Sequence, residues 1–267
     1  GAELTTEDGQ VLTCGLVVGA DGANSWIRKQ ANISLSSWAY HQTAVVCNVT
    51  TSEPHQDACW QQFMPEGPLA FLPLYDGQSS IVWSTTEDKA QSLINMDEDS
   101  FNQALQMTFG SSLGRIQLSS ERGDFPLRLR HANHYVEEHL ALIGDAAHTV
   151  HPLAGQGVNL GLLDAVVLAE ELLNAVEKKR SIGALGTLRR FERRRKSDNI
   201  AMLAAMDGFK RLFSNDITPL KLIRNTGLNI ADKFSPLKKF MTQRAVGLFG
   251  VGLNDRLPRL ARPNLQV

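Results

Sequence analysis

Hydrophobic and polar residues alternate in a β-prone pattern at the start of the chain. Two runs rich in Val, Leu and Thr, residues 2–6 and 11–18, flank an Asp-Gly pair, which is a strong signal for a β-hairpin. Small and polar residues follow, and Asn24 or Ser25 can cap a short helix after them. The pattern therefore predicts a hairpin, a tight loop and a helix.

The pattern from residue 38 to residue 83 is that of an antiparallel sheet. Pro, Gly and Asp separate four β-prone stretches, and the expected strands are 43–49, 59–63, 69–74 and 80–84. Phe101, Leu105 and Phe109 then recur at spacing four, which predicts a helix over 97–109. Another strand is expected over 123–129.

The second half of the chain predicts a buried strand followed by long helices. The apolar run 140–143 ends at Gly144-Asp145, which is typical of a buried strand whose carboxyl end opens into a loop. A helix is expected over 158–178, and it is apolar nearly all round from 160 to 169. The first half of that helix should therefore be buried.

Basic residues gather in the last third of the chain. A second long helix, over 184–213, begins with a basic run from Arg189 to Lys196, which is more often a solvated face than a site for phosphates or anionic lipid. Segment 219–252 interleaves apolar and basic residues, as basic amphipathic helices do. Such helices lie on membrane surfaces or pack in oligomer interfaces, and packing against the rest of the chain is an equally good interpretation.

Composition excludes several classes of protein. The chain has 267 residues, 43% of them hydrophobic and 21% charged, which is typical of a globular protein. Its formal net charge of -1 argues against a general nucleic-acid binder. Three scattered cysteines make neither a disulfide framework nor a Cys-rich zinc site, and they favour a reducing compartment such as the cytoplasm. No apolar run approaches the roughly 18 residues of a membrane-spanning helix.

The densest chemical signal lies between Gly144 and Asn159. Asp145 follows a buried strand, where a carboxylate can accept hydrogen bonds from sugar or ribityl hydroxyls. Gly155-Gln156-Gly157 precedes a long helix, whose free amide groups and dipole favour an anionic group. Any Gly-x-Gly taken alone is more often an ordinary strand–helix junction, but the whole run of residues is far more specific.

Two motifs resemble those of one enzyme family. The run from Gly144 to Asn159 closely resembles the second flavin motif of class A flavoprotein monooxygenases, of the para-hydroxybenzoate hydroxylase type. The matching residues are Gly144-Asp145-Ala146-Ala147-His148, Pro152 and Gly155-Gln156-Gly157-x-Asn159. The Asp-Gly motif of the same family, Asp-Gly-x-x-Ser-x-x-Arg, resembles the stretch from Asp21 to Arg28. Stretches 60–63, 70–74 and 148–157 are similar to the bacterial hydroxylases of ubiquinone biosynthesis. The resemblance spans nearly the whole chain.

The resemblance implies an α/β fold with an incomplete FAD-binding domain of the glutathione-reductase-like Rossmann type. A β-rich substrate domain is inserted into that domain, and helices follow at the C-terminal end. The expected boundaries are 1–31 and 127–183 for the FAD domain, 32–126 for the substrate domain and 184–267 for the C-terminal helices.

The resemblance also implies roles for particular residues. Asp145 would bind the ribityl chain of FAD, and Pro152 would lie near the reactive edge of the flavin. The pyrimidine end would be contacted by the amides around Gly155, Gln156, Gly157, Val158 and Asn159, with Gly144 in the same motif. The pyrophosphate region and NAD(P)H engagement would involve Asp21, Gly22 and Arg28.

The two histidines of this region are weaker candidates. His148 and His151 stand at spacing three with neither a carboxylate nor Cys in register, which is a poor metal site, so no metal is expected. A structural or substrate-lining role is the better interpretation. His151 is the candidate for a polar substrate contact.

In the resembled family, NAD(P)H reduces the flavin, O₂ adds at C4a, and the hydroperoxide hydroxylates an electron-rich ring. A polyprenylated phenol or quinol is the implied substrate. A membrane surface, a second copy of the chain and other ubiquinone-biosynthesis proteins are the implied partners, and nucleic acid is not among them. The implied location is cytoplasmic, with peripheral attachment to the inner membrane as a further option.

One departure from the family keeps alternatives open. The family begins with a Gly-x-Gly-x-x-Gly loop that holds the ADP half of FAD, and these 267 residues contain no such sequence. The chain therefore resembles the C-terminal two-thirds of a hydroxylase, with the missing part expected before Gly1. A flavin reductase of the same fold, or a non-catalytic fragment or module that binds lipid or a partner, remains an alternative.

Overall fold

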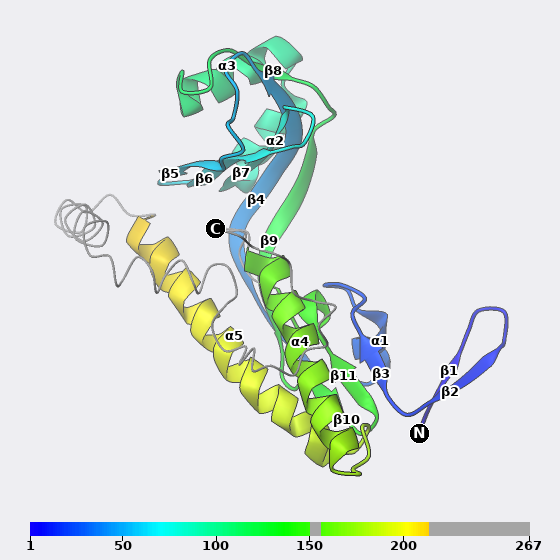
Figure 1. Ribbon diagram of the computed structural model, residues 1–267. Helices are drawn as coiled ribbons and strands as arrows, with labels where there is room; N and C mark the ends of the chain where they lie inside the picture. The colour runs from blue at the N-terminus through cyan, green and yellow to red at the C-terminus, as the bar shows by residue number, and fades with distance from the viewer. Residues whose placement is uncertain (150–155, 214–267) are drawn as a thin grey trace.

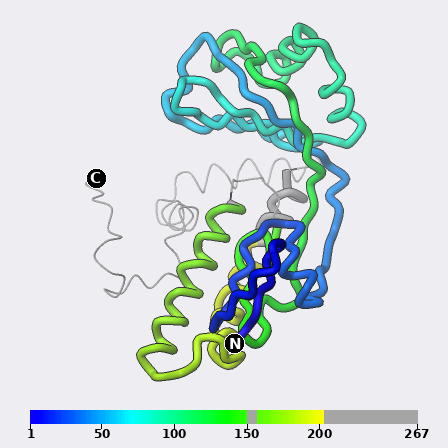
Figure 2. The backbone as a smooth tube through the Cα atoms, turned by 90° about the vertical axis from the view of Figure 1, so that its right-hand side faces the viewer, coloured from blue at the N-terminus to red at the C-terminus, as the bar shows by residue number. Residues whose placement is uncertain are grey.

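The computed structural model describes residues 1–149 and 156–213, with the backbone alone at 156 and 203–213. A β-rich part and an α/β part lie at opposite ends of the described chain (Figure 1). Strands β4 and β9 run side by side from one part into the other, as the view turned by 90° also shows (Figure 2). No helix among the described residues is both long and apolar enough to span a membrane.

The N-terminal hairpin is formed as predicted. β1 (Ala2–Thr5) pairs antiparallel with β2 (Val11–Cys14). The prediction of one strand over 11–18 is wrong, however, because β3 (Val17–Gly19) belongs to a different sheet. The chain changes sheets at Gly15, whose carbonyl oxygen lies 2.8 Å from Nδ1 of His139.

The α/β part contains a three-stranded sheet with the order β10-β11-β3. β10 (Val136–Glu137) is antiparallel to β11 (Leu140–Leu142), and β11 is parallel to β3. Helices α4 (Gln156–Glu177) and α5 (Leu185–Phe213) pack against each other beside this sheet (Figure 1). The strand over 140–143 and both long helices are thus confirmed, with ends shifted by one or two residues.

Helix α4 is less buried than its sequence predicts. Val158 is 73% exposed and Leu162 is 61% exposed, although both lie in the half that was expected to be covered. The described residues cover one side of the helix, where Leu160, Asp164, Val167 and Leu168 are buried. The prediction that the whole first half is buried is therefore wrong.

The β-rich part is the predicted antiparallel sheet, with the order β12-β9-β4-β7-β6-β5 and β8 added on β4. Its strands are β4 (Leu35–Thr51), β5 (Trp60–Met64), β6 (Gly67–Pro73), β7 (Ser79–Thr86), β8 (Ile116–Leu118), β9 (Gly123–Ala132) and β12 (His148–Thr149). β4 and β9 are longer than predicted because they continue into the α/β part. Their register shifts between Ala39 and Thr43, around His41 at φ 51°.

Two helices pack on this sheet. α2 (Glu87–Asn95) was not predicted, whereas α3 (Glu98–Phe109) was. Phe101, Leu105 and Phe109 of α3 are all buried, as their spacing of four indicates. They pack with Leu69, Phe71, Ile81 and Trp83 of the sheet in one hydrophobic cluster. A separate cluster fills the α/β part.

Candidate functional site

The Asp-Gly motif forms the loop that starts α1 (Trp26–Gln30). Ser25 caps this helix by accepting a hydrogen bond from the Arg28 amide, and Asp21 accepts one from the Ile27 amide at 3.0 Å. Partial burial raises the pKa of Asp21, but hydrogen bonds from Ser25 and Ile27 outweigh it and lower the pKa overall. Gly22 has φ +81°, a conformation that L side chains rarely adopt.

Arg28 joins the two flavin-like motifs to each other. Its side chain is 4% exposed, and its guanidinium donates to Ala146 O at 2.7 Å and to Ala23 O at 2.9 Å. Arg130 of β9 donates to the same Ala23 carbonyl at 3.0 Å. Burial and the nearby Arg130 charge lower the pKa of Arg28. The Asp-Gly loop is therefore fastened to the loop after β11.

The turn after β11 presents Asp145 to solvent. A 3-10 helix, η1 (Gly144–Ala146), begins at Gly144 with φ +60°. Asp145 is exposed, and its carboxylate has no hydrogen-bond or ion-pair partner among the residues whose side chains are described. A free carboxylate at the carboxyl end of a buried parallel strand is an acceptor available for hydroxyl groups.

Helix α4 packs closely behind this turn. A Cβ on Gly161 would lie 3.2 Å from Gly144 Cα, so two glycines allow the approach. Helix α4 begins at Gln156, and Gly157, Val158 and Asn159 complete its first turn. The other predicted site residues, His151, Pro152 and Gly155, lie outside the described residues.

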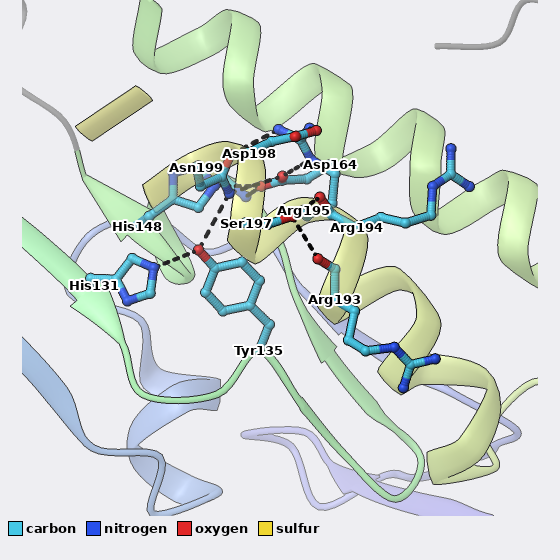
Figure 3. Close-up of polar contacts among 11 residues, drawn as sticks. His131, Tyr135, His148, Asp164, Arg193, Arg194, Arg195, Ser197, Asp198 and Asn199 are labelled. Atoms are coloured by element: carbon cyan, nitrogen blue, oxygen red, sulfur yellow. Dashed lines mark hydrogen bonds and ion pairs between the residues drawn. The ribbon is translucent and has the colours of Figure 1, made fainter. Parts of the chain in front are cut away.

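A buried polar network lies behind the same turn (Figure 3). Asp164 of α4 is fully buried, and its Oδ2 accepts the Gly144 amide at 2.9 Å and lies 2.6 Å from His148 Nε2. Its Oδ1 accepts Nε of Arg195, on α5, at 2.7 Å. Burial raises the pKa of Asp164, but His148 and Arg195 outweigh it, so the pKa is lowered overall.

The network continues through uncharged groups to β9. Arg195 donates to Asn199 Oδ1 at 2.8 Å, Asn199 Nδ2 donates to the Tyr135 hydroxyl at 3.3 Å, and this hydroxyl lies 3.0 Å from His131 Nε2. Burial raises the pKa of Tyr135, whereas burial and the neighbouring Lys196 and His148 lower the pKa of His131 to about 4. At neutral pH both side chains are therefore uncharged, and the hydrogen bond between them joins neutral groups.

The basic run on α5 is only partly the solvated face that its sequence favours. Arg195 is 3% exposed and is bound by Asp164. Arg194 bridges to Glu170 and Glu171 of α4 at 2.9 and 2.8 Å. The interpretation of the run as a solvated face is therefore wrong for Arg195, whereas Arg194 is partly exposed.

Sequence analysis missed Asp164, although a signal was present. A lone carboxylate within the apolar stretch 160–169 must be paired if it is buried, which predicts a cationic partner elsewhere in the chain. His148 is 1% exposed and serves this pairing. No group of three or more His, Cys, Asp or Glu suited to a metal ion occurs among the described residues.

Comparison with known proteins identifies the family. Residues 2–201 match the FAD binding domain family, and the chain belongs to that family. It is 40% identical to the ubiquinone hydroxylase UbiL of Rhodospirillum rubrum, over 98% of this chain and 61% of that protein. It is 42% identical to the 3-demethoxyubiquinol 3-hydroxylase of Escherichia coli, over 92% of this chain and 63% of that protein.

The chain thus spans about three-fifths of the length of these relatives. Among solved structures, p-nitrophenol 4-monooxygenase PnpA of Pseudomonas putida superposes with a TM-score of 0.71 at 17% identity. The match covers 92% of this chain and 62% of that one. At this identity it shows the fold, which is mixed α/β with an FAD-binding architecture.

Proposed function

We propose that this chain is the larger part of an FAD-dependent monooxygenase of ubiquinone biosynthesis. Its reaction uses NAD(P)H and O₂ to hydroxylate the ring of a polyprenylated phenol or quinol. The identity of about 40% to two ubiquinone-pathway hydroxylases, over nearly the whole chain, carries the proposal. The same similarity favours a hydroxylase over a flavin reductase or a non-catalytic module.

The donor set around the β11 turn fits FAD. Asp145 offers an exposed carboxylate without a partner among the described side chains, which suits the hydroxyls of a ribityl chain. Gly157, Val158 and Asn159 offer the first turn of α4, whose dipole stabilises negative charge on a bound ring by about 0.3–2 kcal/mol. In this proposal Gly144, Pro152, Gly155 and Gln156 complete the flavin site.

When bound, FAD would supply the redox chemistry, which is hydride transfer from NAD(P)H and the activation of O₂. The chain itself binds and orients the cofactor. Asp145 accepts hydrogen bonds from the ribityl hydroxyl groups, and Asp21 and Gly22 line the pyrophosphate side of the site. Arg28 stabilises the same loop by donating a hydrogen bond to the Ala23 carbonyl. NAD(P)H engagement is proposed at this loop. His151 is proposed as a polar contact to the substrate.

The two hydrophobic clusters support a division into a flavin part and a substrate part. We assign 1–31 and 127–183 to the flavin part, which is of the Rossmann type, with 32–126 as the inserted substrate part and 184–267 as the C-terminal helices. The boundary at 126 falls inside β9, which contributes to both parts. A membrane-surface or oligomer contact depends on segment 219–252, which lies outside the described residues.

Titration with FAD, followed by product analysis, tests the proposal. The wild-type protein should bind FAD with a flavin absorption spectrum and, with NAD(P)H and O₂, add one oxygen atom to a prenylated phenol. Asp145→Ala should weaken FAD binding, whereas Asp99→Ala, which removes an exposed carboxylate from the β-rich part, should not. Bound flavin without any oxygenated product would contradict the hydroxylase assignment.

A further inference from the structure

We infer that Asp164 is a positioning residue that holds the 144–148 turn and thereby presents Asp145 to the ribityl chain. The inference rests on the proposed flavin site. Asp164 itself is fully buried and contacts only protein groups among the described residues. It therefore acts on the cofactor through the turn.

One carboxylate oxygen forms hydrogen bonds with both ends of the turn. Oδ2 of Asp164 accepts the Gly144 amide at 2.9 Å and bonds His148 Nε2 at 2.6 Å. These two residues bracket Asp145, so a shared acceptor fixes the distance between the residues on either side of it. A hydrogen bond to an ionised group is shorter and stronger than one between neutral groups.

Arg195 provides the opposite charge for this carboxylate and, with His148, lowers its pKa. An isolated buried carboxylate is strongly disfavoured, and Arg195 supplies the opposing charge at Oδ1 with a side chain that is 3% exposed. Its remaining donors bind Asp198 and Asn199 of its own helix. Helix α5 thus fixes the position of Asp164, and Asp164 fixes the position of the 144–148 turn.

Two further contacts restrict the turn from other sides. Gly161 lies three residues before Asp164 and meets Gly144 so closely that a Cβ on Gly161 would stand 3.2 Å from Gly144 Cα. Arg28 holds the Ala146 carbonyl at 2.7 Å. Gly144, Ala146 and His148 are therefore each fixed by the protein, whereas the Asp145 carboxylate has no partner among the described side chains.

Paired substitutions separate this role from general stability. Asp164→Leu combined with Arg195→Met removes both buried charges together, an exchange that folds often tolerate. Asp164→Asn combined with Arg195→Met restores an acceptor of nearly the same shape. Arg194→Gln is the control, because it breaks a partly exposed bridge between the same two helices.

The full-length holoprotein and its variants are compared by FAD titration, by the visible flavin spectrum and by the two-electron midpoint potential. We expect the Leu/Met pair to weaken FAD binding about tenfold or more, equivalent to the loss of one charged hydrogen bond, and to change the spectrum and potential. The Asn/Met pair should recover most of the affinity, and Arg194→Gln should match the wild type. A folded Leu/Met protein with wild-type FAD affinity would overturn the inference.

Two controls keep the test decisive. If the Leu/Met protein does not fold, Gly161→Ala displaces the turn without touching a charge, and unchanged FAD affinity in that variant overturns the inference. If the wild type itself binds no FAD, the proposed function fails instead. Amide hydrogen exchange at Gly144 then tests the hold of Asp164 on the turn by itself: slow exchange supports it and exchange at the rate of an open loop contradicts it.

Discussion

The two parts of the molecule are held together by different kinds of interaction. In the β-rich part, the buried polar side chains are uncharged residues and one histidine: Gln42, Thr43, His55, Ser79, Ser84 and Thr85. Every buried Asp or Arg of the described residues lies in the α/β part: Arg28, Asp164 and Arg195. The charges gather where the flavin-like motifs meet.

The two parts therefore obtain their shapes from different interactions. Apolar packing tolerates substitution as long as volume and pattern are kept, because it has no direction. A buried ion pair contributes little net stability but accepts few alternative geometries. We therefore expect the β-rich part to depend on filled volume, and the turn that carries Asp145 to depend on the hydrogen bonds that the side chain at position 164 accepts.

The largest effect should come from breaking the buried pair on one side. Asp164→Leu leaves Arg195 buried without its counter-ion, and the free energy of unfolding should fall by about 3–5 kcal/mol. Adding Arg195→Met should recover most of that loss. Urea denaturation of both variants checks this, and equal losses in the two would show that the charge is not the cause.

Removing apolar volume from the β-rich part should affect stability alone. Leu105 is fully buried in α3, and Leu105→Ala should lower the free energy of unfolding by about 2–5 kcal/mol through the cavity it leaves. FAD affinity should not change in the folded protein. Thermal unfolding with and without FAD measures both quantities. Weaker FAD binding by Leu105→Ala would contradict the prediction that the β-rich part affects stability alone.

The smallest effect should be a pH dependence that originates at His131. Its pKa is about 4 in the folded protein, against an ordinary 6.5, so between these values the unfolded chain binds more protons. The free energy of unfolding should therefore fall as the pH drops from 6.5 to 4, by about 1–2 kcal/mol after allowance for solvent screening.

His131→Gln should flatten this slope, which urea denaturation at several pH values would reveal. The contribution of Asp164 falls in a different window. Its folded pKa is lowered, so its stabilising effect is lost only below its ordinary value of 3.8. A slope between pH 4 and 6.5 that persists in His131→Gln would assign it to another group.

Much of the fold could be predicted from the chain because its signals are local. The spacing of Phe101, Leu105 and Phe109 defines α3, and the Ser25 cap marks the start of α1. The end of β2 at Cys14 was missed because no local signal marks it. The chain passes to another sheet at Gly15, where the contact with His139 is long-range. Helix α2 carries its cap, Thr86, at the end of a strand, where a strand pattern hides it.

The site divides in the same way. Asp145 and the Asp-Gly loop stand in recognisable motifs, so their roles could be proposed from sequence. The partners of Asp164 are 16, 20 and 31 residues away, and no periodicity connects them. An ion pair between two helices can be inferred from a buried lone charge, but its members are identified only once the helices are placed.

The decisive experiment on the role of Asp164 is FAD titration of the wild type beside the double variant that combines Asp164→Leu with Arg195→Met. We expect the wild type to bind FAD, and we expect the two substitutions together to weaken the binding about tenfold or more while the protein stays folded. Equal FAD affinity in the two folded proteins would contradict the claim that Asp164 holds the cofactor-binding turn in position.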